Sequence, residues 1–218
     1  KRNTYATVTK ENNMTLSELE SIIGVKFPKK WHEIYNTGAM EWLEAGVGVF
    51  RENRDKYLND PKAFLMLSCD CEPLMFDEIP ERIEEVGEWI SWRTEHDGAA
   101  LKKGVALVPF AMRGNGDLFC FICQGDLMDE PKIMLYCHDC YEDEYLMWTS
   151  FDELLYECML QTADPDFGDD ITDEHWQMHL DYLTEEYRTR LVGRSREDMY
   201  NEYLNLPEIM ESIWEKKQ

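Results

Sequence analysis

Two apolar segments joined by a short turn constrain the fold more than any other feature of the chain. Val105 to Met112 is an apolar run, and Asp117 to Cys123 is a second run that is rich in aromatic residues. Residues 113–116 between them read Arg-Gly-Asn-Gly. Asn and Gly tolerate the positive φ angles that tight hairpin turns require. The sequence therefore predicts an antiparallel β-hairpin near the middle of the chain.

Helices are predicted on both sides of this hairpin. Thr15 followed by Glu18 is typical of a capping box at a helix start, and Ser150 followed by Glu153 repeats the pattern. The predicted helices span residues 14–23, 28–35 and 80–93, and a further helix begins at residue 150. The predicted strands span residues 63–67, 105–112, 117–123, 132–138 and 145–148. Strands do not alternate with helices along the chain. We therefore expect an α+β fold, an antiparallel sheet flanked by helices.

The composition changes after Leu160. Residues 162–172 are acidic and contain a proline and a glycine, which is typical of a linker. Thr172 to Lys217 has a helical pattern with many charges, broken near Gly193 and Pro207. The sequence thus predicts an α+β domain over residues 1–160 and an acidic linker with a charged helical extension over residues 161–218.

The chain is strongly acidic. It has 45 Asp and Glu residues against 22 Lys and Arg residues, for a formal net charge of −23. Such a field repels nucleic acid and anionic membranes and attracts basic partners, although acidic residues also serve solubility alone. We therefore expect a protein partner, with no binding to nucleic acid or membrane.

Other features favour a cytoplasmic location. No apolar run approaches the roughly 20 residues that a membrane-spanning helix needs. Lys1 to Thr9 lacks the apolar core of a signal peptide. The chain has seven cysteines, an odd number that fits a reducing compartment better than a framework of disulfides.

Four motifs, in order along the chain, resemble those of the SMI1/KNR4 (SUKH) superfamily. Two positions depart from the family pattern: Phe27 replaces a leucine and Leu154 replaces a phenylalanine. Residues 39–104 are longer than the family minimum, and residues 161–218 lie outside the resemblance. The motifs are Leu19 to Trp31 followed by Tyr35 to Gly38, then Val108 to Ala111 with Gly114 to Phe121, then Leu135 to Asp139, and then Ser150 to Leu155.

The resemblance implies an α+β fold of the SMI1/KNR4 type and a function in binding. In bacteria it implies an immunity protein that neutralises a polymorphic or contact-dependent toxin, often a nuclease. In fungi, relatives are linked to cell-wall synthesis and signalling, so a regulatory scaffold is an alternative. An acidic inhibitor suits a basic toxin, which agrees with the net charge. The chain has no recognisable catalytic constellation, and we do not expect an enzyme.

Acidic residues concentrate in two loops that follow predicted strands. One loop spans residues 124–131 and the other spans residues 139–144, and ordinary solvated loops are the alternative interpretation. The second loop also contains a tyrosine, a residue type that is enriched where proteins bind one another. The predicted partner-binding residues are Asp126, Asp129, Glu130, Asp139, Tyr141, Glu142, Asp143 and Glu144.

Four cysteines offer a zinc-stabilised module as a further alternative. Cys120 and Cys123 form one CxxC pair, and Cys137 and Cys140 form another. The hairpin interpretation opposes a shared site, because it places Cys123 opposite Lys132 and separates the sulfurs along the strands. We therefore expect small buried hydrophobic residues, and no cofactor.

Histidines supply two weaker candidates for a metal-binding or catalytic site. His175 and His179 lie four residues apart on a predicted helix, but Trp176 stands where a metalloprotease motif needs its glutamate. A solvated helix face is the expectation for both. His138 and Asp139 form a possible acid–base pair at the end of a predicted strand.

Overall fold

The computed structural model describes residues 13–58, 60, 62, 70–124, 130–138, 143–165 and 173–215. The predicted strand over 63–67 lies outside these residues. The helices are α1 (Leu16–Ile23), α2 (Lys29–Tyr35), the 3₁₀ helix η1 (Glu41–Glu44), α3 (Gly46–Leu58), α4 (Ile79–His96), α5 (Phe151–Gln161), α6 (Asp173–Leu180), α7 (Glu185–Leu191) and α8 (Arg196–Tyr203). The strands are β1 (Glu72–Pro73), β2 (Ala100–Leu101), β3 (Val105–Met112), β4 (Leu118–Gln124), β5 (Ile133–Tyr136), β6 (Tyr145–Trp148), β7 (Ile209–Glu211) and β8 (Trp214–Glu215). No helix in the described parts of the chain is long and apolar enough to cross a membrane.

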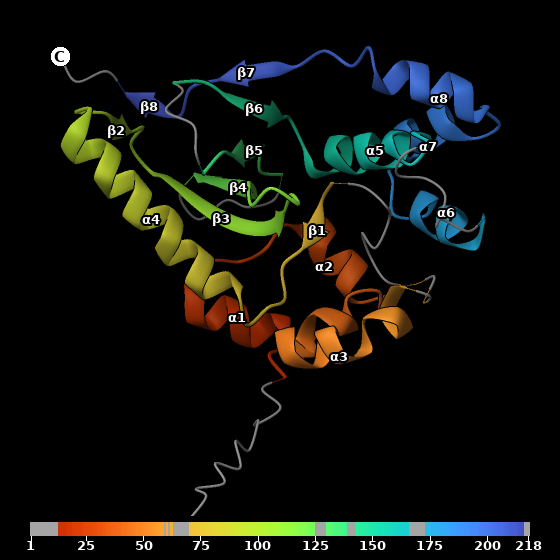
Figure 1. Ribbon diagram of the computed structural model, residues 1–218, viewed down its shortest axis with the longest axis horizontal. Coiled ribbons are helices and arrows are strands. Elements are labelled where there is room, and N and C mark those ends of the chain that lie inside the picture. The colour runs from red at the N-terminus through yellow and green to blue at the C-terminus, as the bar shows by residue number, and fades with distance from the viewer. Residues whose placement is uncertain are drawn as a thin grey trace, which may run out of the picture.

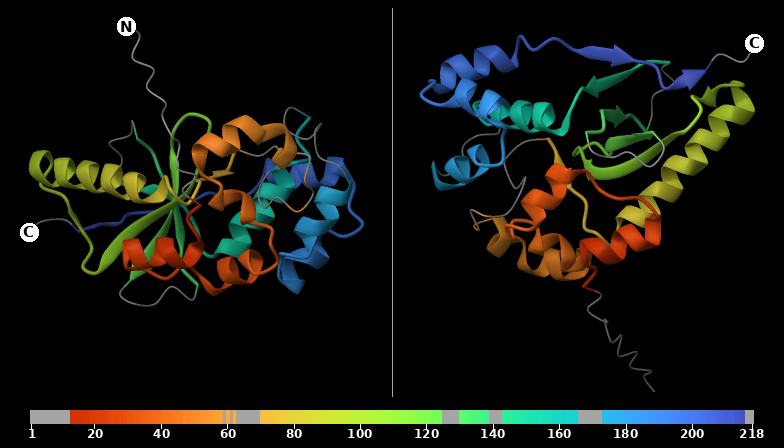
Figure 2. Two further views of the ribbon diagram at one scale, coloured as in Figure 1. Left: turned by 90° about the horizontal axis from the view of Figure 1, so that it is seen from below. Right: turned by 180° about the vertical axis from the view of Figure 1, so that it is seen from behind.

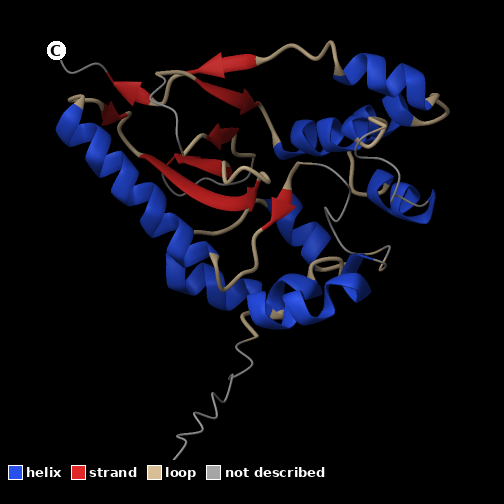
Figure 3. Cartoon of the chain, in the orientation of Figure 1, coloured by secondary structure: helices blue, strands red, loops and turns tan. Residues whose placement is uncertain are grey.

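Among the described residues, a six-stranded antiparallel sheet forms the centre of the molecule, with the strand order β1-β3-β4-β5-β6-β7 (Figures 1 and 3). The predicted hairpin is its β3–β4 pair, in which Val108 lies opposite Phe121. The turn depends on Gly116, which has a φ of +97° that residues with a Cβ rarely adopt. The structure therefore confirms the α+β fold with an antiparallel sheet.

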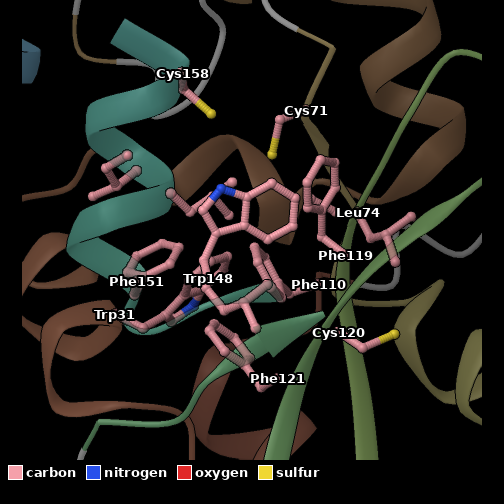
Figure 4. Packing of buried hydrophobic residues seen from close by; sticks show 14 of the residues in the cluster. Trp31, Cys71, Leu74, Phe110, Phe119, Cys120, Phe121, Trp148, Phe151 and Cys158 are labelled. Carbon is pink, nitrogen blue, oxygen red and sulfur yellow. The ribbon is translucent and has the colours of Figure 1, made fainter. Parts of the chain in front are cut away.

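Aromatic side chains pack one face of this sheet against α2 and α5. Trp31 of α2 is fully buried, and its ring centroid lies 5.5 Å from that of Phe110, 5.8 Å from that of Phe121 and 5.5 Å from that of Phe151. Figure 4 shows these rings gathered between α5 and the strands, while Cys120 points away from them. Large buried rings contribute much of the hydrophobic stabilisation of a core, so this cluster anchors both helices.

The opposite face of the sheet is covered by α4, which runs along one side of the molecule (Figures 1 and 2). Trp89 of α4 packs edge-on against Tyr136 of β5 at 4.6 Å between ring centroids, and Val86 is also buried. Since helices cover both faces, β4 is buried along nearly its whole length. A strand buried on both faces has a continuous apolar sequence instead of an alternating one, which explains the uninterrupted apolar runs.

The predicted helix caps are present, with one difference. Thr15 and Glu18 form a complete capping box at the start of α1. Ser150 caps α5 by accepting a hydrogen bond from the backbone N–H of Glu153, but the Glu153 carboxylate accepts from the backbone N–H of Thr149 instead of that of Ser150. The second box is therefore only half formed.

In its described residues, the C-terminal extension contains three helices and also two short strands that the sequence pattern did not predict. Strand β7 pairs with β6 and becomes an edge of the main sheet, while β8 pairs with β2. Strand β2 likewise lies where the sequence predicted neither a helix nor a strand. Strands of two or three residues are too short to carry a period-two pattern, so they form where a neighbouring strand offers hydrogen bonds.

His175 and His179 are buried, so the expected solvated helix face is wrong. Their side chains are 5% and 3% exposed, and Nδ1 of His179 lies 2.8 Å from the backbone carbonyl of His175, to which it donates. Burial lowers the pKa of His179 from 6.5 to about 4. The charged residues around both histidines in the sequence concealed this apolar environment.

Acidification is expected to destabilise the protein through His179. Between pH 7 and pH 5 the unfolded chain gains a proton there and the folded chain does not, so stability falls as pH falls. With the pKa at about 4 in the folded chain, the loss is about 2 kcal/mol over this range. Urea unfolding of wild type and of the His179→Gln variant measures it, and the variant should lose that part of the pH dependence.

His96→Gln is the matched control, since His96 Nδ1 also lies 2.8 Å from the carbonyl four residues earlier but on an exposed face. Equal pH dependence of His179→Gln and wild type would contradict the assignment to His179.

Candidate partner-binding site

Three of the eight predicted partner-binding residues lie in the described structure, and they separate into two places. Asp143 and Glu144 border a pocket beside the C-terminal end of α4. Glu130 borders two other depressions, one shared with Lys30 and one shared with Lys132. The remaining predicted residues, which are Asp126, Asp129, Asp139, Tyr141 and Glu142, lie outside the described residues.

The pocket beside α4, which we call the α4 pocket, has a volume of about 990 Å³. Its walls come from three parts of the chain. The end of α4 and the turn after it contribute Arg93, Asp97, Gly98 and Ala99, and the segment before β6 contributes Asp143 and Glu144. The C-terminal strands and their connection contribute Met210, Ser212, Trp214 and Glu215.

Arg93 is the buried centre of this pocket. Its side chain is only 3% exposed, so its charge has to be compensated by partners. Nε donates to Asp97 at 3.1 Å, Nη2 donates to Asp143 at 3.2 Å, and Nη1 donates to the Tyr145 hydroxyl at 3.1 Å. These bonds tie α4 to the segment that leads into β6.

Two tryptophans that pack against each other both contact the same guanidinium group. The Arg93 Cζ atom lies 4.9 Å from the ring centroid of Trp214 and 5.7 Å from that of Trp89. The indole N–H of Trp214 also donates to the Tyr145 hydroxyl at 3.1 Å. Burial raises the pKa of Tyr145, so its hydroxyl is neutral at pH 7 and accepts both bonds. Cation–π contact and hydrogen bonds therefore fix the C-terminal strand on α4.

The rim of the α4 pocket is negative. Asp97, Asp143, Glu144 and Glu215 supply four carboxylates around the single guanidinium of Arg93, which leaves a formal excess of three negative charges. Asp143 and Glu144 are exposed, and so is Glu215. A pocket with this balance attracts cations and repels anions.

The outward face of α4 extends the negative surface. Glu81, Glu85, Glu88 and Glu95 are exposed at helical spacing along one stripe, together with Trp92, which is 39% exposed. We call these five residues the α4 stripe. Glu81 lies in the favourable first turn of α4 and Glu85 pairs with Arg82 at 2.7 Å, whereas Glu95 lies at the unfavourable C-terminal end. Helix stability therefore accounts for only part of the stripe, which places an exposed aromatic ring among carboxylates.

His138, which was predicted to pair with Asp139, contacts a different acid in the described structure. Nδ1 of His138 lies 2.9 Å from a carboxylate oxygen of Asp117, and the backbone N–H of His138 donates to the same oxygen at 3.2 Å. Burial alone raises the pKa of Asp117, but hydrogen bonds from Asn115 and His138 outweigh it and hold that pKa below its usual value. This contact joins the β3–β4 turn to the end of β5. Asp139 lies outside the described residues.

Glu20 plays a comparable structural role in the first motif. Its buried carboxylate accepts a hydrogen bond from the backbone N–H of Phe27 at 2.8 Å and contacts Lys26 and His32 at 2.8 and 2.7 Å. Burial raises the pKa of Glu20, but these partners hold it below its usual value. The motif residues near Gly24 thus form a fixed connection between α1 and α2.

The cysteine geometry differs in detail from the expectation. Cys120 lies opposite Met134, so the register of β4 and β5 differs by one residue from the predicted pairing. The backbone N–H of Ile122, and not that of Cys123, donates to the carbonyl of Lys132. Cys120 and Cys123 are both buried and lie three positions apart on β4, so they face opposite sides of the sheet. Burial raises the pKa of Cys123 to about 11, which disfavours the thiolate that zinc requires.

The second cysteine pair adds no metal site to the described structure. Cys137 is disulfide-bonded, and Cys140 lies outside the described residues. Within the described ranges, no group of three or more His, Cys, Asp or Glu side chains is arranged to hold a metal ion.

Comparison with known proteins gives one match. No curated protein and no solved structure matches the chain. Residues 12–157 match the model of the SMI1/KNR4 family (SUKH-1), which covers α1 through most of α5 and leaves the C-terminal strands outside. The matched region is more than half of the chain and contains all four motifs. The chain therefore belongs to the SMI1/KNR4 family (SUKH-1).

Proposed function

We propose that this protein is an immunity protein that binds a cognate toxin domain and blocks it without turnover. The family supports this proposal, because it includes immunity proteins. The observation that carries the choice of partner is the negative surface formed by the α4 stripe and the rim of the α4 pocket. A toxin that acts on nucleic acid has a basic substrate-binding surface, which such a face complements.

The proposed mechanism is occlusion. The net charge of −23 steers a basic toxin domain toward the protein, and Trp92 provides an apolar contact within the acidic stripe. Once docked, the protein covers the surface that the toxin needs for its substrate. We expect it to act in the cytoplasm, where a toxin that attacks nucleic acid has to be intercepted.

Co-expression tests this function. Cells that express the toxin domain encoded next to this gene should survive when they also express the wild-type protein. The charge-reversal variant Glu88→Lys/Glu95→Lys, which changes only the α4 stripe, should protect at least about tenfold fewer cells, because it turns attraction into repulsion.

The matched control is Glu186→Lys/Glu197→Lys, which makes the same charge change at exposed positions of α7 and α8. Equal loss of protection in both variants would mean that net charge alone, and not the stripe, is responsible.

A further inference from the structure

We propose that the α4 pocket receives one arginine or lysine side chain of the basic partner, and that the C-terminal segment 209–215 helps to select that partner. This inference rests on the proposed function and assigns its contact to individual residues. It follows from the charge of the pocket, from the residues that form its walls and from the part of the chain that supplies those residues.

The charge of the pocket selects a cation. Arg93 is the only cation among the described residues that border it, and its donors already bond to Asp97, Asp143 and Tyr145. Glu144 and Glu215 remain at the rim as exposed carboxylates. An entering ammonium or guanidinium group meets an excess of negative charge, whereas an entering carboxylate is repelled.

The walls suit a long side chain with an apolar stem. Met210 is 42% exposed and gives the pocket a flexible hydrophobic surface beside the acids. Lysine and arginine bury their methylene stems on apolar surfaces while their charged ends contact polar groups. The volume of about 990 Å³ is ample for one such side chain with part of its backbone.

The C-terminal wall is held in place by contacts at both ends. Lys132 Nζ lies 2.6 Å from the Glu211 carboxylate, and Lys102 Nζ donates to the backbone carbonyl of Ser212 at 2.5 Å. The backbone N–H of Lys103 donates to Glu215 at 3.1 Å. Together with the pairing of β7 and β8, these contacts form the wall before any partner arrives, which lowers the entropy cost of binding.

The family match ends at residue 157, so this wall lies outside the part of the chain that resembles other members. Arg93, Asp97, Asp143 and Glu144 belong to the matched region, while Met210, Ser212, Trp214 and Glu215 do not. Four of the ten described residues that border the pocket therefore come from the extension of this chain. Sequence differences at those four positions would change which basic surface fits.

The first test measures the affinity of the toxin domain encoded nearby for wild type and for the Glu144→Gln/Glu215→Gln variant. Glutamine keeps the size of both side chains and removes only their charge, and we expect the Kd to rise about tenfold. Glu186→Gln/Glu197→Gln is the matched control, because it removes the same charge at exposed positions of α7 and α8 that do not border the α4 pocket, and its Kd should stay within about twofold of wild type. Equal affinities of the pocket variant and the control would overturn the inference while the proposed function stands.

The second test requires no toxin. Arginine amide is titrated into ¹⁵N-labelled protein while the indole N–H signal of Trp214 is followed by NMR. A saturable shift that disappears in Glu144→Gln/Glu215→Gln and is absent with N-acetylglutamate supports a cation pocket. No saturable shift, or an equal shift with the anion, would overturn it. If the shift is found but no neighbouring toxin binds, the pocket is supported and the immunity function fails.

Discussion

Replacing Trp31 with alanine is expected to lower the free energy of unfolding by about 3–5 kcal/mol. The Trp31 side chain is 0% exposed and contacts rings from α5 and from strands β3 and β4. Alanine would leave a cavity that these rings cannot fill without losing their own contacts. Urea unfolding followed by circular dichroism measures the change.

Trp92→Ala is the natural control for this substitution. Trp92 is 39% exposed and stacks on His96, so its loss should cost less than about 1 kcal/mol. If Trp31→Ala does not give soluble protein, Trp31→Phe serves in its place and should fall between the two. A Trp31 variant as stable as Trp92→Ala would show that the aromatic cluster is not the core.

Replacing Trp214 with alanine is expected to destabilise the protein by about 3 kcal/mol. Trp214 is 7% exposed, covers the buried Arg93 guanidinium and packs on Trp89 at 5.4 Å between ring centroids. Its removal opens the pocket to water and weakens the attachment of β8. The same unfolding assay measures the effect, with the indole signals of the remaining tryptophans reporting the state of α4.

Leu204→Ala provides the comparison for the C-terminal extension, because Leu204 is 60% exposed and its truncation should change stability by less than about 0.5 kcal/mol. Unchanged stability of Trp214→Ala would mean that the C-terminal strands do not unfold together with the main sheet.

Local patterns predicted the central elements well. The turn at Gly114 to Gly116, the aromatic strand after it and the cap at Thr15 are encoded by residues that lie close together in the sequence. Such features depend on local conformational preferences, so a single sequence is sufficient to find them. The same holds for β6, which the sequence placed at the observed residues.

The α4 pocket was not predictable in this way. Arg93 lies 50 positions from Asp143, and Trp214 lies 69 positions from Tyr145, so only the tertiary fold brings them together. Asp143 and Glu144 were predicted as binding residues from local charge alone, which is also why Glu130 was grouped with them although it borders different depressions. A buried arginine that contacts a pair of packed tryptophans leaves no signal at any one position of the sequence.

The short strands and the buried histidines of the extension were not predicted, for a related reason. Its charged helices were predicted from their pattern, whereas β7 and β8 depend on pairing with β6 and β2. His175 and His179 were expected in solvent because their neighbours are polar, yet the tertiary fold buries both. In each case packing between distant segments overrides local composition.

Survival after co-expression is the decisive measurement for the proposal that this acidic SMI1/KNR4 protein neutralises a basic toxin by binding it. Cells that express the neighbouring toxin domain are expected to form colonies with the wild-type protein at the frequency of toxin-free cells, and Glu88→Lys/Glu95→Lys is expected to lose most of this protection. Equal killing with and without the wild-type protein, for every toxin domain encoded next to the gene, would contradict it.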